Sequence, residues 1–219
     1  MLDVYQFVSG PLVWCAFIIF IGGSLYRLIS LLVLVHRKER FIYSYMSWKY
    51  SLRSILRWST PFATENMRRH PGMTIVTFAF HICLLLTPLF LLAHIILIEE
   101  AWNMSWWTLP DGLADTMTLI VIAGCIFFFA RRLTNSEVQY VTSASDFILL
   151  AIVVAPFVTG FIAYYQWFGY QFFVILHILS GEIMLVAIPF TRLSHMLTAP
   201  LTRAYMGSEF GGVRRARDW

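Results

Sequence analysis

Long apolar stretches alternate with short polar segments along the whole chain. A helix needs about 20 mainly apolar residues to cross the hydrocarbon core of a bilayer. Five stretches have this character, namely residues 11–35, 73–98, 113–130, 147–165 and 171–191. The pattern predicts an all-α integral membrane protein with five transmembrane helices, built as a single membrane domain over residues 1–219.

The composition agrees with a chain that lies mainly in lipid. Of its 219 residues, 59% are hydrophobic and 13% are charged, whereas a soluble domain carries about 25% charged residues. The three cysteines, Cys15, Cys83 and Cys125, lie far apart inside apolar stretches. Because an iron–sulfur cluster needs a set of closely spaced cysteine ligands, we do not expect this chain to hold one.

Basic residues are concentrated in three of the polar segments, and the segments 99–112 and 166–170 contain no Lys or Arg. Because cytoplasmic loops carry the excess of Lys and Arg, we expect the N-terminus outside and the C-terminus in the cytoplasm. The net charge of +4 then reflects topology and gives no reason to expect a nucleic-acid partner. The basic residues are Arg37, Lys38, Arg40, Lys49, Arg53, Arg57, Arg68 and Arg69 after the first stretch, Arg131 and Arg132 after the third, and Arg192, Arg203, Arg214, Arg215 and Arg217 after the fifth.

The predicted cytoplasmic loop 36–72 contains a segment, residues 41–67, that is too polar to cross the membrane. Large apolar residues alternate in it with Lys49, Arg53 and Arg57, a pattern typical of an amphipathic helix that lies along the membrane interface. Two interpretations stay open, an anchor on the membrane surface and a docking surface for a cytoplasmic subunit. The tail 192–219 is expected on the same side.

Four histidines are assigned to two of the predicted spans: His81 and His94 to the second, and His177 and His195, which follows the apolar stretch by four residues, to the fifth. Ionisable residues inside spans are costly and usually functional. With the expected topology, His81 lies at the inner depth with His195, and His94 at the outer depth with His177. Paired histidines are typical of the axial ligands of an electron-transfer haem, because they leave no position open for oxygen or substrate. Hydrogen bonding between helices is the alternative role.

The two histidine spacings differ in how well they suit a straight helix. Eighteen residues from His177 to His195 make five turns of 3.6 residues, so a continuous helix would turn both to the same side. The thirteen residues from His81 to His94 make a rotation of about 220°, and Pro88 between them is expected to kink the helix. His94 is therefore assigned by its depth.

Glu182 is an acidic residue inside the fifth apolar stretch, five residues after His177. One interpretation is a carboxyl group that burial keeps neutral. We consider two roles for Glu182, the relay of a proton from a quinone and a hydrogen bond to a haem edge.

Three segments together resemble the gamma subunit of respiratory nitrate reductase, a five-span dihaem cytochrome b. They are GMTIVTFAFH, which ends at His81, ARRLTNSEVQYVTSASDFILL, which contains Asp146, and LHILSGEIMLVAIPFTRLSH, which ends at His195. The resemblance covers roughly residues 71–198. It implies a four-helix bundle of spans two to five that binds two haems b, with His81 and His195 as ligands of the inner haem and His94 and His177 as ligands of the outer one.

The resemblance also implies a membrane-anchoring subunit of a respiratory complex in the cytoplasmic membrane of a bacterium or archaeon. Such a subunit passes electrons between menaquinone or another quinone and a cytoplasmic iron–sulfur partner, and it is not catalytic alone. The basic inner loop and PLFLLAH resemble family relatives in sulfate-reducing bacteria. The complexes of those relatives include a periplasmic multihaem cytochrome c and an iron–sulfur protein related to heterodisulfide reductase.

Two differences from the family and two other functions bear on this hypothesis. The second-span histidines, His81 and His94, are further apart than in the family, so His94 is assigned by its depth. The segment EEAWNMSWWTLPDG lacks the basic residue that the family uses near quinol, so we expect a differently built quinone pocket. The chain also suits a haem-bearing structural anchor without quinone turnover, or a proton-conducting transporter that uses its histidines and Glu182. It contains no catalytic triad and no glycine-rich nucleotide loop.

Overall fold

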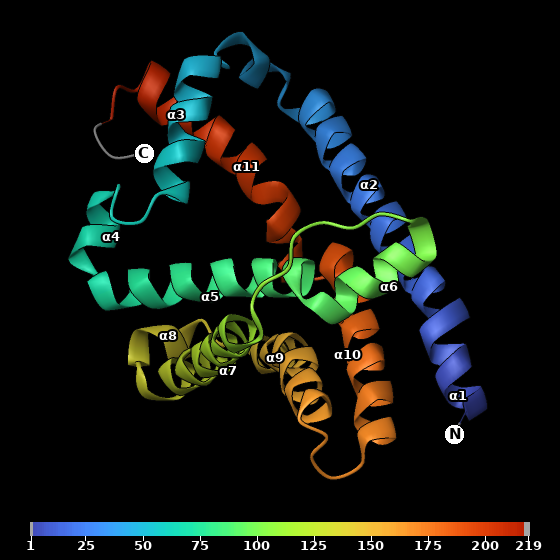
Figure 1. Ribbon diagram of the computed structural model, residues 1–219. Coiled ribbons are helices and arrows are strands. Elements are labelled where there is room, and N and C mark those ends of the chain that lie inside the picture. The colour runs from blue at the N-terminus through green and yellow to red at the C-terminus, as the bar shows by residue number, and fades with distance from the viewer. Residues whose placement is uncertain (1, 217–219) are drawn as a thin grey trace. The chain divides into compact units, whose positions relative to one another are not determined.

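The computed structural model describes residues 2–216, and every regular element in that part of the chain is a helix (Figure 1). Arg217, at the end of the basic tail, lies outside the described residues. Five helices are long and apolar enough to cross a membrane, namely Leu2–Lys38, Pro71–Phe90, Asp111–Thr134, Ala144–Tyr164 and Tyr170–Phe190. The predicted all-α membrane class with five spans is confirmed.

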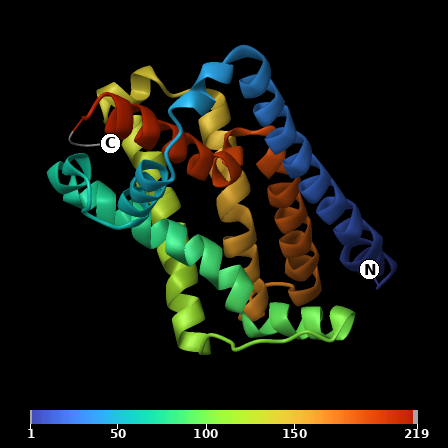
Figure 2. The ribbon, with the colours of Figure 1, turned by 90° about the horizontal axis from the view of Figure 1, so that it is seen from above.

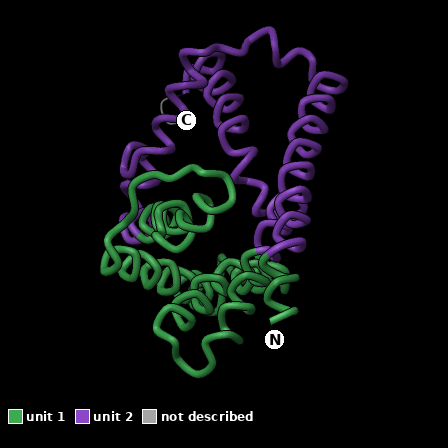
Figure 3. Tube along the Cα trace, turned by 45° about the vertical axis from the view of Figure 1, so that its right-hand side comes forward, with its two compact units in different colours: residues 1–9, 76–181 green, residues 10–75, 182–219 purple. Residues whose placement is uncertain are grey.

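The chain forms two compact units (Figure 3). Unit 1 comprises Met1–Ser9 and Val76–Gly181, and unit 2 comprises Gly10–Ile75 and Glu182–Trp219. The first span consists of α1 (Leu2–Phe7), a π-helical turn η1 (Val8–Leu12) and α2 (Val13–Lys38), and it is longer than the predicted stretch 11–35.

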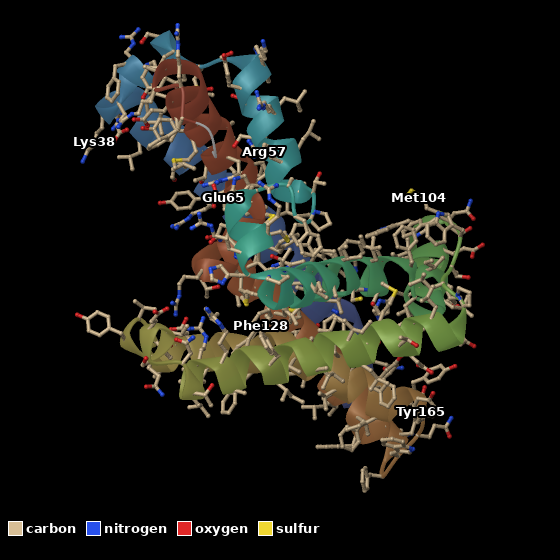
Figure 4. All side chains as sticks on the ribbon, turned by 90° about the vertical axis from the view of Figure 1, so that its left-hand side faces the viewer. Lys38, Arg57, Glu65, Met104, Phe128 and Tyr165 are labelled. Carbon is tan, nitrogen blue, oxygen red and sulfur yellow. The ribbon has the colours of Figure 1, made fainter. Side chains whose placement is uncertain are left out.

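Unit 1 contains most of spans two to five. Its α7 (Asp111–Thr134) packs along α9 (Ala144–Tyr164), and its part of α5 (Pro71–Phe90) packs on α7. The ring of Phe80 on α5 meets that of Phe128, which is labelled in Figure 4, edge-on, with 5.2 Å between ring centres. A Cβ atom at Gly124 would lie 2.8 Å from the Phe80 ring, so the missing side chain allows this close approach.

Polar contacts join α7 to α9 through the short helix α8 (Ser136–Tyr140). The side-chain oxygen of Asn135 accepts the N–H groups of residues 137 and 138, which caps α8. Asp146 Oδ2 accepts the N–H and hydroxyl groups of Ser143 at 2.9 Å each, and its Oδ1 pairs with Arg132 at 3.1 Å. The segment that the sequence singled out around Asp146 is thus a charge-assisted cap that holds the two spans together.

The second span ends sooner than the sequence predicts. The stretch 73–98 was expected to form one kinked helix, but α5 ends at Phe90 and α6 (Leu92–Trp102) begins after a break at Leu91. Leu91 has the extended angles φ −73° and ψ 129°. Pro88 lacks an N–H group and its ring crowds the preceding turn, which weakens the helix here. His81 and His94 therefore lie on different helices.

The fifth span also ends before its second histidine. α10 (Tyr170–Phe190) is followed by extended Thr191, the 3-10 turn η3 (Arg192–Ser194) and α11 (His195–Met206). Pro189 supplies no N–H group to the last turn of α10, and the Thr191 hydroxyl accepts the Leu193 N–H at 3.2 Å, which starts the new turn. The expectation that His177 and His195 share one continuous helix was wrong.

In unit 2 the middle of α2 lies close to the end of the last span, α10. A Cβ atom at Gly23 on α2 would lie 2.8 Å from the ring of Pro189 near the end of α10 (Figure 2). The two helices therefore approach each other through a glycine and a proline, which allow close packing without a large side chain between them.

Small residues hold α3 (Trp48–Ser59) against α11 and the π-helical segment η4 (Gly207–Val213). The Ser208 hydroxyl accepts the Ser47 N–H at 3.0 Å and lies 3.0 Å from the Ser51 hydroxyl. Ser51 also donates to the Ala204 carbonyl at 3.1 Å. A Cβ atom at Gly207 would lie 2.4 Å from the Tyr50 carbonyl oxygen, so this contact requires glycine.

The outward side of α3 carries its large apolar residues. Trp48 is 92% exposed, and Leu52 and Leu56 are each 57% exposed. Lys49 and Arg53 lie beside this apolar stripe. The segment is thus the amphipathic helix that the sequence predicts, with its serine side packed inward and its apolar side available to lipid or a partner subunit.

We expect Gly207→Ala to destabilise unit 2 by about 1–3 kcal/mol, the usual range for an overpacked core position. The added methyl group would collide with backbone, which yields less readily than a flexible side chain. Thermal unfolding of the detergent-solubilised protein measures the change. Gly72→Ala is the matched control, because nothing lies within 4 Å of a Cβ atom there. Equal melting temperatures for the two variants would contradict the prediction.

Candidate functional site

Unit 1 brings His94 and His177 together. His94 is the third residue of α6, and His177 lies within α10. Their ring centres are 5.9 Å apart and their ring planes differ by 15°. These are the two residues that the sequence assigned to the outer haem, so the pair with the weaker sequence argument is adjacent in the fold.

Both rings are anchored in the same way. The Nδ1–H of His94 donates to the Pro88 carbonyl at 2.8 Å, and that of His177 donates to the Pro156 carbonyl at 2.8 Å. Each ring is therefore the tautomer whose Nε2 keeps its lone pair. Within residues 2–216, no hydrogen bond is made to either Nε2 atom. The Nε2 atoms of both histidines, which would bind a metal, thus have no hydrogen-bond partner among the described residues.

Gly160 on α9 makes room for the ring of His177. A Cβ atom at Gly160 would lie 2.8 Å from both Cε1 and Nδ1 of that ring. Next to it, the hydroxyls of Thr159 and Ser180 are 3.2 Å apart, and the Ser180 hydroxyl donates to the His177 carbonyl at 2.9 Å. The face of α9 therefore fixes both the position and the orientation of His177.

The spacing of this pair fits a haem iron between the two rings. A metal–imidazole bond is about 2 Å long, and the ring centre lies about 1 Å beyond the nitrogen, so two axial rings have centres about 6 Å apart. The observed 5.9 Å agrees with this value. Two histidines alone suit a haem, because the porphyrin supplies the other four ligands. The described residues hold no group of three or more His, Cys, Asp or Glu side chains placed for a metal ion.

The predicted inner pair is divided between the units. His81 on α5 belongs to unit 1, and its Nδ1–H donates to the Thr77 carbonyl at 2.8 Å. His195, exposed at the start of α11, belongs to unit 2, and its Nδ1–H donates to the Arg192 carbonyl at 2.8 Å. All four candidate ligands thus share one anchoring pattern, which is typical of histidines that bind metal through Nε2. The pairing of His81 with His195 stays a prediction.

Glu182 is buried on α10, with 7% of its surface exposed. Neither of its carboxylate oxygens has a hydrogen-bond partner among residues 2–216. Five residues separate it from His177, which is about 140° around the helix. The carboxyl group therefore points away from the side of α10 that carries the histidine.

Sequence reasoning missed the residues that hold the histidines in place. Pro88 is predicted from the sequence only to kink a helix, and no sequence pattern points to Pro156 or Gly160. Pro156 lies 21 residues before His177, so no local pattern links the two. Their roles depend on the packing of α9 against α10.

Residues 6–171 match the nitrate reductase gamma subunit family. The chain belongs to this family. A protein of the sulfate-reducing bacterium Nitratidesulfovibrio vulgaris is 36% identical over 220 residues, which cover 97% of each chain. No solved structure matches. The family match ends before His177 and His195, whereas the similarity to the N. vulgaris protein covers nearly the whole chain.

Membership of the nitrate reductase gamma family decides the broad function. The family consists of haem b cytochromes that act as membrane subunits of multi-subunit redox complexes. This member is accordingly a multi-pass membrane haem subunit of a redox complex. The histidine geometry described above agrees with the chemistry of the family.

We expect Gly160→Ala to displace the ring of His177 and to lower the amount of haem bound per protein. The added methyl group would lie well inside contact distance of that ring, and moving the ring would break its hydrogen bond to Pro156. Gly181→Ala on α10 is the control, because a Cβ atom there meets nothing within 4 Å. Pyridine haemochrome spectra measure the haem. Full haem content in Gly160→Ala would show that the ring does not need this space.

Proposed function

We propose that this chain is a dihaem cytochrome b subunit that passes electrons across the membrane, between a quinone pool and a cytoplasmic iron–sulfur partner. The observation that carries the proposal is the pair His94 and His177, spaced for one metal ion and each anchored through Nδ1. When bound, haem supplies reversible one-electron transfer. Menaquinone is the quinone we expect.

In this proposal the chain's own residues hold and tune the ligands. The carbonyls of Pro88 and Pro156 orient the rings of His94 and His177, and a hydrogen bond from Nδ1 makes Nε2 a stronger donor to metal. His81 and His195 are proposed as the ligands of a second haem, supported by the same anchoring to backbone carbonyls.

The proposed topology places the N-terminus outside and the C-terminus in the cytoplasm of a bacterial or archaeal inner membrane. The basic loop 36–72 and the tail then lie on the side of the iron–sulfur partner, which we expect to resemble heterodisulfide reductase. A periplasmic multihaem cytochrome c is the expected partner on the other side. The chain acts as one functional domain that needs these partners for a complete reaction.

Glu182 is proposed to relay a proton during quinone turnover. Its support is the burial of a carboxyl group whose oxygens have no partner among the described residues. Such a group is stable when neutral and gains or loses a proton when a charged neighbour appears. A hydrogen bond to a haem edge is the alternative role.

The ratio of haem to protein tests the dihaem proposal. We expect about two haems b per chain, because bis-histidine ligation uses one pair of histidines for each haem. His94→Ala and His81→Ala should each lose one haem, while His36→Ala, whose ring packs against Tyr43, should keep both. Pyridine haemochrome spectra provide the counts. One haem in the wild type would refute the dihaem proposal, and none would favour the proton-conducting transporter.

Reduction by a menaquinol analogue separates an electron carrier from a structural anchor. We expect the haem absorbance of the intact complex to change on mixing, because the proposed subunit exchanges electrons with quinol. Haem that stays oxidised would leave only the anchor role. Glu182→Gln should slow the reduction several-fold at unchanged haem content, since an amide cannot relay the proton. An unchanged rate would assign Glu182 to the alternative role.

A further inference from the structure

The segment 103–110, which follows α6, runs back alongside that helix towards the start of α7 (Figure 2). It contacts the chain beside the break at Leu91. In an uninterrupted helix, the carbonyls of residues 88–90 would accept the N–H groups of residues 92–94. The break removes these donors, and a backbone carbonyl without a partner is costly in a membrane. Each of the three carbonyls takes a substitute donor.

Two of the substitutes are side chains. The Pro88 carbonyl accepts the Nδ1–H of His94 at 2.8 Å. The next carbonyl, that of Leu89, accepts the indole Nε1–H of Trp106 at 2.9 Å. Trp106 is 38% exposed, so its indole ring lies at the edge of the unit with its N–H directed at the break. His94 and Trp106 thus donate hydrogen bonds to the carbonyls of two consecutive residues.

The third substitute comes from the backbone of the same segment. The Phe90 carbonyl accepts the N–H of Leu109 at 2.9 Å, and Leu109 is buried. The ring of Trp107 stacks on that of Phe90, with 4.2 Å between centres and 24° between planes. Trp106, Trp107 and Leu109 therefore hold the segment against the end of α5.

We propose that Trp106 is a positioning residue for His94, acting through the turn 88–90. The peptide groups on either side of Leu89 share its Cα atom, so when this turn moves to bring the Leu89 carbonyl to a new donor, the displaced Cα atom also shifts the Pro88 carbonyl. That carbonyl fixes the ring of His94 through Nδ1. Without the indole N–H, the ring loses its fixed orientation towards His177. The proposal depends on the proposed role of His94 as a haem ligand.

The test is Trp106→Phe in the full-length protein, because phenylalanine keeps an aromatic ring and removes only the N–H donor. We expect near wild-type haem content, a several-fold rise in the fraction of reduced haem that binds carbon monoxide, and a broadened low-spin EPR signal from one haem. Carbon monoxide needs an open axial position, which a loosened His94 provides. Trp48→Phe, at a residue 92% exposed in unit 2, should match the wild type.

A second variant separates the hydrogen bond from ring packing. Trp106→Gln loses the ring and keeps an N–H donor, so it should restore most of the wild-type resistance to carbon monoxide. Two results would overturn the proposal: both haems spectrally unchanged in Trp106→Phe, or an equal loss of both haems in the two variants. A different result would refute the proposed function itself, namely a His94→Ala variant that binds as much haem as the wild type. That comparison is therefore made first.

Discussion

The hydrogen bonds from imidazole Nδ1 atoms to backbone carbonyls are the interaction on which this structure's chemistry depends. A helix that breaks in a membrane leaves carbonyls without donors, and lipid offers none. Here the donors include the histidines themselves. The break at Leu91 frees the Pro88 carbonyl, and His94 satisfies it. The break in the helix thus provides the carbonyl that orients the candidate ligand His94.

A second constraint is close packing through small residues. Helices in lipid gain no hydrophobic driving force from meeting each other, so they associate through close contact and hydrogen bonds. Gly160 admits the His177 ring, Gly124 admits Phe80, and Gly207 admits the backbone of α3. The large apolar side chains are left to face outward, as on α3. This division explains why an apolar chain keeps so many of its bulky residues exposed.

Proline stands next to an interruption of a span twice. Pro88 and Pro189 each stand close to the end of a span, and in both places a histidine lies just beyond the break, His94 in α6 and His195 in α11. Pro156, inside α9, supplies the carbonyl that holds His177. Two of the candidate ligands, His94 and His195, therefore lie just after interruptions of the helices, where backbone carbonyls are accessible to side chains.

The sequence by itself determined the five spans and the helical class, because apolar length is a property that the chain carries locally, and it pointed to the candidate histidines as ionisable residues in lipid. It also identified Asp146 through a motif, and the structure explains that residue as a cap paired with Arg132. Spacing along an ideal helix failed at His94 and His195, because it assumes helices that do not break. Only the tertiary structure decided that His94 meets His177, and which carbonyls, glycines and tryptophan hold them. These partners lie up to 21 residues away, on other helices or in the segment 103–110, and their contacts arise from packing that no local pattern encodes.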